Sequence, residues 1–128
     1  KQLTPQKSIL SADKKDIKRL MMPLTGLVRL YALKFKINAL STPERIIGLY
    51  SGKHIDHKIL KNTMKAWKDL TSIRLSHQAS CILKGLAPDN IIDPGISDNN
   101  ISLIAAQSVD SINDLFLKSS NDFYNDHI

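Results

Sequence analysis

Three polar side chains near the end of one long stretch of the sequence could act together on a ligand. The stretch, residues 56–85, has no proline and no internal glycine, so it favours a single helix of about 45 Å at 1.5 Å per residue. In such a helix His77 and Gln78 follow Arg74 by three and four residues, which brings the three polar ends to one place. The functional interpretation is that they contact an anion or another part of a substrate.

The same side chains also have a structural interpretation. The helical wheel puts Arg74 on the stripe that carries Leu60 and Trp67, and burying a charge is costly unless the charge is paired. Arg74 would then pair with an acidic residue of another helix or with carbonyl groups of the loop at 87–95. His77 would be a neutral hydrogen-bonding group of the core. The residues leave both interpretations open, and we favour the loop contact because a proline-rich loop with little regular structure needs such donors.

Other chemical motifs are absent from the sequence. It has no glycine-rich phosphate loop, no GxSxG, no CxxC and no HExxH, so we predict no catalytic residue. His54 and His57 flank Asp56, but they lie at a predicted helix start with no further ligand nearby in the sequence. We therefore expect an exposed capping turn there, with no metal and no cofactor held by this chain.

Composition indicates one aliphatic, all-α domain. The 128 residues include only three Phe, three Tyr and one Trp, so a core must be built mainly from aliphatic side chains at helical spacing. We expect a tail or linker at residues 1–12 and a single helical domain at 13–128. The single Cys81 cannot form an internal disulfide, which favours a cytoplasmic location. No apolar run is long enough to predict a membrane span.

Charge is distributed unevenly along the chain. Residues 1–86 contain seventeen lysines and arginines against five acidic residues, whereas residues 87–128 contain one lysine against seven aspartates. A basic surface can bind nucleotide phosphates or nucleic acid. Because no aromatic residues interleave with the lysines, nucleic acid is not the partner we expect. We favour a solvated basic face that the acidic last helix neutralises.

Start and stop signals predict four principal helices, at residues 23–36, 42–50, 56–84 and 98–124. Pro23 suits a first helical turn, where its missing N–H is not needed, and the charged segment 13–19 before it is expected to be a connector. Ser41 and Asp56 are good N-caps, and Gly85 is a good helix end. The short connections favour an antiparallel bundle.

Apolar spacing predicts the buried face of each helix. The first helix is nearly apolar all round, with Leu30 and Leu33 widening its face, which is typical of a helix in the middle of a bundle. The short second helix is expected to bury Ile46, Ile47 and Tyr50. In the last helix, which Asp98 or Asn99 would cap, apolar residues recur at steps of three and four: Ile101, Ala105, Val109, Ile112, Phe116 and Phe123.

Six short motifs occur in an order seen in one bacterial family. They are DIKR (16–19), MPL (22–24), LVRLYAL (27–33), TPER (42–45), RLSHQ (74–78) and, after Gly85, PDNIIDP (88–94). With these motifs the chain resembles, over about residues 13–125, the C-terminal helical domain of the nucleotidyltransferase-like proteins called the domain of unknown function 294 group. The fold that the resemblance implies is similar to nucleotidyltransferase substrate-binding helical domains.

The resemblance implies a place in a larger protein. In that family the helical domain follows a nucleotidyltransferase-like domain, usually preceded by cyclic-nucleotide-binding and CBS domains, in bacterial signal-transduction proteins. Its role is similar to that of the helical domains of kanamycin nucleotidyltransferase and of the uridylyltransferase that acts on nitrogen-regulatory protein PII. The catalytic glycine-serine pair and the paired aspartates lie in the preceding domain, where a nucleotide and Mg²⁺ would bind. This chain contains neither motif.

The hypothesis from sequence is a non-catalytic substrate-binding or regulatory module that forms one wall of a nucleotide cleft with the upstream domain. The resemblance and the charges suggest four residues for that wall and two for the interdomain junction: Arg29, Arg45, Arg74 and His77, then Lys18 and Arg19. The alternative is a module for protein–protein interaction or homodimer formation in signalling, without nucleotide binding.

Overall fold

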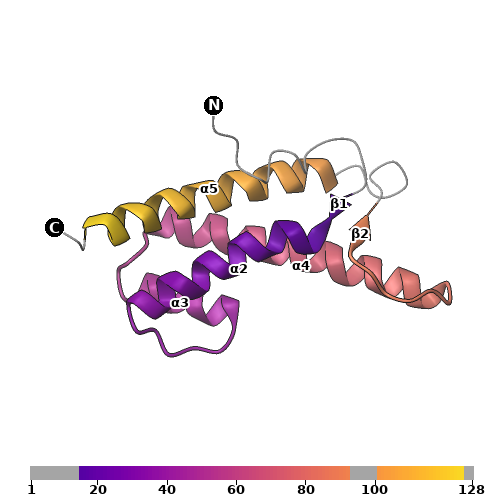
Figure 1. Cartoon of the computed structure of the whole chain (residues 1–128), viewed down its shortest axis with the longest axis horizontal. Helices are drawn as coiled ribbons and strands as arrows, with labels where there is room; N and C mark the ends of the chain where they lie inside the picture. Colours follow the sequence, from indigo (N-terminus) through magenta and orange to yellow (C-terminus); the bar gives the residue numbers. More distant parts are fainter. Residues whose placement is uncertain (1–14, 93–100, 126–128) are drawn as a thin grey trace.

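The described part of the chain folds into four helices and one very short β-ladder (Figure 1). The computed structural model describes residues 15–92 and 101–125. The elements are β1 (Lys15–Asp16), α2 (Ile17–Lys34), α3 (Thr42–Ser51), α4 (His57–Leu83), β2 (Ile91–Ile92) and α5 (Ile101–Asn125). In Figure 1, α4 runs opposite to both α2 and α5. The prediction of an all-α bundle of four principal helices is confirmed.

The start of the bundle differs from the sequence prediction. Residues 15 and 16, expected to lie in a charged connector, form β1, which pairs antiparallel with β2 in the segment expected to have no regular structure. Helix α2 begins at Ile17, which is fully buried, and Asp16 caps it by accepting a hydrogen bond from the Lys18 amide at 3.0 Å. Pro23 therefore lies inside α2 rather than in its first turn, and it lacks the N–H of an interior residue.

Helix α2 is the centre of the core, as expected, and it packs against α3, α4 and α5. Leu20, Leu24 and Val28 are fully buried along it. Leu30 and Leu33, however, are 57% and 62% exposed, so one side of this apolar helix faces solvent. Neighbouring helices cover only the stripe that the 3.6-residue period turns toward them.

The buried faces of α3 and α4 are each shifted from the prediction. In α3, Ile46 is buried as expected, but Leu49 is the second buried residue, while Ile47 and Tyr50 are exposed. The most deeply buried residues in the first half of α4 are Thr63, Ala66 and Leu70, and the predicted stripe through Leu60, Met64 and Trp67 is only half-buried beside them. The buried face in this half of α4 is therefore rotated by one residue, about 100°, from the predicted stripe.

Helix α5 follows the predicted pattern over most of its length. Its buried residues include four expected ones: Ile101, Ala105, Val109 and Ile112. Phe116 is 52% exposed, and Leu115 is buried in its place. Asp98 and Asn99, the predicted caps, and the side chain of Phe123 lie outside the described residues.

Three other sequence signals are confirmed. The hydroxyl of Ser41 accepts a hydrogen bond from the Glu44 amide at 3.3 Å, and Asp56 accepts one from the Ile59 amide at 2.8 Å. Gly85, just past the end of α4, has φ +76°, a left-handed conformation that favours glycine. None of the helices in the described residues is long and apolar enough to cross a membrane.

Candidate functional site

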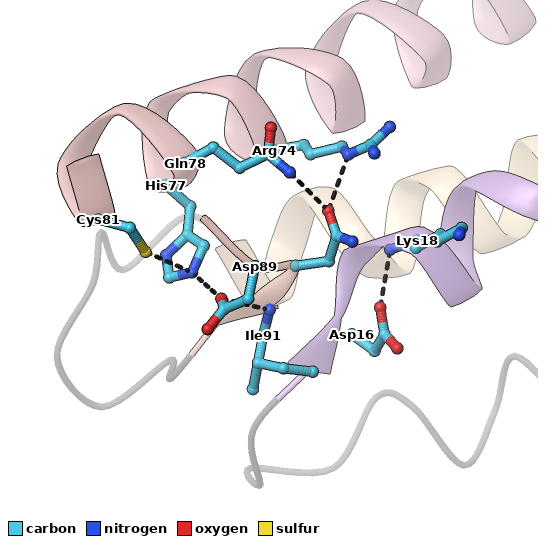
Figure 2. Close-up of polar contacts among 9 residues, drawn as sticks. Asp16, Lys18, Arg74, His77, Gln78, Cys81, Asp89 and Ile91 are labelled. Atoms are coloured by element: carbon cyan, nitrogen blue, oxygen red, sulfur yellow. Dashed lines mark hydrogen bonds and ion pairs between the residues drawn. The ribbon is translucent and has the colours of Figure 1, made fainter. Parts of the chain in front are cut away.

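The last three turns of α4 hold the segment that leads into β2 through side-chain hydrogen bonds (Figure 2). Arg74 Nε donates to Asn90 Oδ1 at 2.8 Å, and Gln78 Nε2 donates to the same oxygen at 3.0 Å. The backbone oxygen of Asn90 accepts from the Ile17 amide at 2.9 Å. Asn90 therefore connects α4 to the first residue of α2.

The neighbouring Asp89 makes the second link to α4. One of its carboxylate oxygens, Oδ1, lies 2.6 Å from His77 Nε2 and accepts from the Ile91 amide at 3.1 Å. The Sγ atom of Cys81 lies 3.5 Å from the same nitrogen of His77. Cys81 is buried, His77 is half-buried and Asp89 is exposed. We call Arg74, His77, Gln78, Asp89 and Asn90 the loop cluster.

The loop contact predicted for Arg74 is present, but its chemistry differs from the prediction. Arg74 bonds to the side-chain amide oxygen of Asn90 rather than to an acidic residue or a loop carbonyl group. His77 is half-buried and contacts the exposed Asp89 carboxylate rather than a group of the core. Asp89 and Asn90 belong to a motif of the family, but the sequence alone predicted no role for either residue. The adjacent RLSHQ and PDN motifs were the signal that could have paired them.

The predicted site residues do not all gather at one place. Lys18 and Arg19 are exposed in the first turn of α2, which Ile17 joins to the loop cluster. Arg45 lies in α3, where its Nε donates to the carbonyl oxygen of Ala39 at 3.2 Å. Residue 39 follows the far end of α2, a helix about 27 Å long. One small ligand therefore cannot bridge Arg45 and the loop cluster.

Arg29 is exposed in the second half of α2, in a turn that lies between these two ends. It thus shares no contact with the loop cluster among the described residues. The structure brings together Arg74 and His77, with Lys18 and Arg19 near them.

Two shallow hollows between α4 and α5 form a competing candidate site. Their volumes are about 300 and 280 Å³, and they share Asn62, Ser111 and Asp114. Their linings contain four aspartates against two lysines: Asp56, Asp69, Asp110 and Asp114 against Lys58 and Lys65. This excess of negative charge disfavours phosphate, so the hollows are less suited to a nucleotide than the loop cluster.

A buried tyrosine near the other end of α2 contacts α5 and the turn between α3 and α4. The Tyr31 hydroxyl lies 3.1 Å from the carbonyl oxygen of His54 and donates to the Asp122 carboxylate of α5. Burial, together with the hydrogen bond and the charge of Asp122, raises the pKa of Tyr31 well above its usual value. This arrangement favours the neutral tyrosine and is structural.

The two histidines considered for a metal contact aromatic rings. His54 stacks on Phe35 with ring centroids 3.6 Å apart, and His57 meets the ring of Tyr50 edge-on at 6.0 Å.

The fold and the loop cluster define a small all-α domain with a polar, partly basic end. The chain belongs to the DUF294_C family, described as "Putative nucleotidyltransferase substrate binding domain", whose family model matches residues 3–96. The matched range contains α2, α3, α4 and both short strands, and it ends before α5. Comparison with curated proteins gave no match, and comparison with solved structures gave none either.

Proposed function

We propose that this domain is a non-catalytic substrate-binding module that forms one wall of a nucleotide cleft, with a nucleotidyltransferase-like domain upstream as the other wall. The family description supports the class of function. The observation that carries the site is the geometry of Arg74. Its Nε bonds to Asn90, while in Figure 2 its two terminal nitrogens point away from Asp89 and Ile91. A guanidinium fixed in this way can offer its terminal N–H groups to a phosphate.

The positive charges around Arg74 also favour a binding site at this end of the bundle. Lys18 and Arg19 are exposed in the adjoining first turn of α2, and in this proposal they would face the upstream domain. His77 would contribute to the same wall. In this proposal Arg29 and Arg45 lie too far along the bundle for the same phosphate and would contact another part of the substrate or of the upstream domain.

The proposed setting follows the family resemblance. The intact protein would be a cytoplasmic bacterial signal-transduction protein in which a nucleotide and Mg²⁺ bind at the upstream domain, with CBS and cyclic-nucleotide-binding domains sensing a signal. The helical module would then select the substrate or transmit the signal.

The test is nucleoside triphosphate binding by the full-length protein with Mg²⁺, followed by calorimetry. Arg74→Ala is expected to weaken binding by about tenfold or more, because a hydrogen bond to a charged group contributes about 1.5–3 kcal/mol. Lys61→Ala removes an exposed lysine from the same helix, about 20 Å away, and serves as the control. Its affinity should equal that of the wild type.

The structural interpretation of Arg74 makes a different prediction for the same variants. If Arg74→Ala lowered only the melting temperature and left the affinity unchanged, Arg74 would hold the loop and would not contact the nucleotide. Asn90→Ala separates the two roles, because it removes the loop contact and keeps the guanidinium.

A second candidate function is self-association, and exposed apolar side chains on the last turns of α4 favour it. Leu75, Ile82 and Leu83 are exposed, the last of them at 88%. A dimer through this face predicts that the mass measured by light scattering rises with protein concentration and that Leu83→Lys abolishes the rise. A constant monomer mass would exclude it.

A further inference from the structure

We propose that His77, Cys81 and Asp89 form a binding site for a divalent metal ion of the zinc type. Each residue offers one ligand atom, and these three atoms lie within 4.8 Å of one another. His77 and Cys81 are one turn apart on α4, and Asp89 approaches them from the segment that precedes β2 (Figure 2). This inference uses only these three side chains and does not rest on nucleotide binding.

Two of the three distances between the ligand atoms can be compared with those around a tetrahedral ion. With Zn–N about 2.0 Å and Zn–S about 2.3 Å, tetrahedral angles place a ligating nitrogen and sulfur about 3.5 Å apart. The distance from His77 Nε2 to Cys81 Sγ is 3.5 Å. A nitrogen and a carboxylate oxygen would lie about 3.3 Å apart around the same ion. The His77–Asp89 distance is 2.6 Å, so the carboxylate would move outward by about 0.7 Å. Because Asp89 is exposed, a shift of this size would move its carboxylate toward solvent.

The surroundings already orient the ligands. The Ile91 amide donates to Asp89 Oδ1 at 3.1 Å and fixes the carboxylate toward His77. The Leu86 amide donates to the carbonyl oxygen of Cys81 at 2.8 Å, which turns the chain back over the end of α4. Cys81 is only 7% exposed, whereas the Asp89 side chain is 56% exposed. The site is therefore closed on the sulfur side and open on the carboxylate side, where water could complete the coordination.

The donor set selects the metal. A thiolate, an imidazole and a carboxylate suit Zn²⁺ or Co²⁺, whereas Mg²⁺ and Ca²⁺ prefer oxygen ligands alone. On binding, the Cys81 thiol gives its proton to solvent, and the proton between His77 Nε2 and Asp89 leaves that contact for His77 Nδ1 or for solvent. The sulfur, Nε2 and a carboxylate oxygen then become the metal ligands. The metal would then link the segment before β2 to α4.

The first test is a titration of the metal-free, untagged full chain with Co²⁺. A sulfur-to-cobalt charge-transfer band is expected at one equivalent, and Zn²⁺ should abolish it. Because the chain contains a single cysteine, such a band can come only from Cys81. Absence of the band would overturn the proposal.

The second test uses Zn²⁺ affinity in matched variants. Cys81→Ser, His77→Gln and Asp89→Asn should each weaken binding by at least about tenfold, since loss of even an outer-shell partner costs about 10- to 100-fold. His57→Gln removes an exposed histidine outside the site and should leave the affinity unchanged. Equal affinity in all four variants would assign the binding elsewhere and overturn the proposal.

A third measurement needs no variant, so it remains valid if a substitution impairs folding. Zn²⁺ should slow the reaction of Cys81 with a thiol reagent and raise the melting temperature, because an ion that binds only the folded state stabilises it. Thiol reactivity that is unchanged by Zn²⁺ would contradict the site.

Discussion

Two regions of the molecule are held in place by different forces. Around α2 the core consists of fully buried aliphatic side chains, such as Leu20 and Leu24, packed against α3, α4 and α5. The loop cluster itself consists of polar side chains that are half-buried or exposed, and Arg74, Gln78 and Asn90 hold the chain through hydrogen bonds. Burying a leucine contributes about 1.5–3 kcal/mol, whereas a typical hydrogen bond contributes a net 0.5–1.5 kcal/mol.

This difference indicates where stability and binding are located. Regions with few buried apolar contacts open at lower free energy than the core. Their polar groups can also exchange a protein partner for a ligand without loss of the core. The loop cluster is therefore the part of the domain suited to recognition, and the α2 core supports it.

The largest expected effect is on the core. Leu24→Ala should lower the free energy of unfolding by about 2–5 kcal/mol, since it removes a fully buried side chain and leaves a cavity. Leu30→Ala on the same helix is the matched control, because Leu30 is exposed and its loss should change stability by less than about 0.5 kcal/mol. Urea denaturation measures both. Similar losses in the two variants would contradict the burial pattern of α2.

A smaller and local effect is expected in the loop cluster. Asn90→Ala leaves two part-buried donors, Arg74 Nε and Gln78 Nε2, without their acceptor, at a cost of about 1–3 kcal/mol. Hydrogen exchange of the Ile17 amide, which bonds to Asn90, should accelerate by about tenfold or more, while exchange in the middle of α3 stays constant.

The control for this local effect is another half-buried asparagine. Asn62→Ala, in α4, should leave Ile17 exchange unchanged. If Asn90→Ala accelerated exchange equally throughout the bundle, the loop cluster would be part of the global folding unit, and the contrast between the two regions would fail.

The smallest effect concerns a polar contact inside the core. Tyr31→Phe removes the hydroxyl contacts to His54 and Asp122 and should cost about 1 kcal/mol near neutral pH. The folded-state pKa of Tyr31 is raised, so its stabilisation is complete below its unfolded pKa of about 10 and falls as the pH rises beyond that value.

Unfolding free energies between pH 8 and 12 would measure this effect. The wild type should lose an increment of stability above about pH 10 that Tyr31→Phe lacks. Tyr50→Phe is the control, since the half-exposed Tyr50 makes no hydroxyl hydrogen bond within the described residues. An unchanged difference between wild type and Tyr31→Phe across this range would contradict the account of Tyr31.

Much of the fold could be predicted because its signals are local. The caps at Ser41 and Asp56, the end at Gly85 and the apolar period of α5 each depend on residues within one or two turns. The predictions of buried residues were wrong where contact with a neighbouring helix decides which side chain is buried. Phe116 and Leu115 are equally plausible from periodicity, and the position of α4 against α5 buries only Leu115.

Only one half of the candidate site, the residues on α4, could be predicted from the sequence. The spacing of Arg74, His77 and Gln78 on one helical face follows from the sequence alone. Their partners do not, because Asp89 and Asn90 lie on a separate segment whose path local signals do not determine. The proximity of Cys81 to Asp89 was missed for the same reason.

The sequence by itself therefore determined the four helices, most of their ends, and the polar face that starts at Arg74. Only the tertiary structure decided that Lys15 and Asp16 pair with Ile92 and Ile91, that α2 begins before Pro23, and that the chain after α4 turns back to the Cys81 carbonyl group. The physical reason is range: helix formation depends on contacts within a few residues, whereas strand pairing and loop docking join segments far apart in the chain.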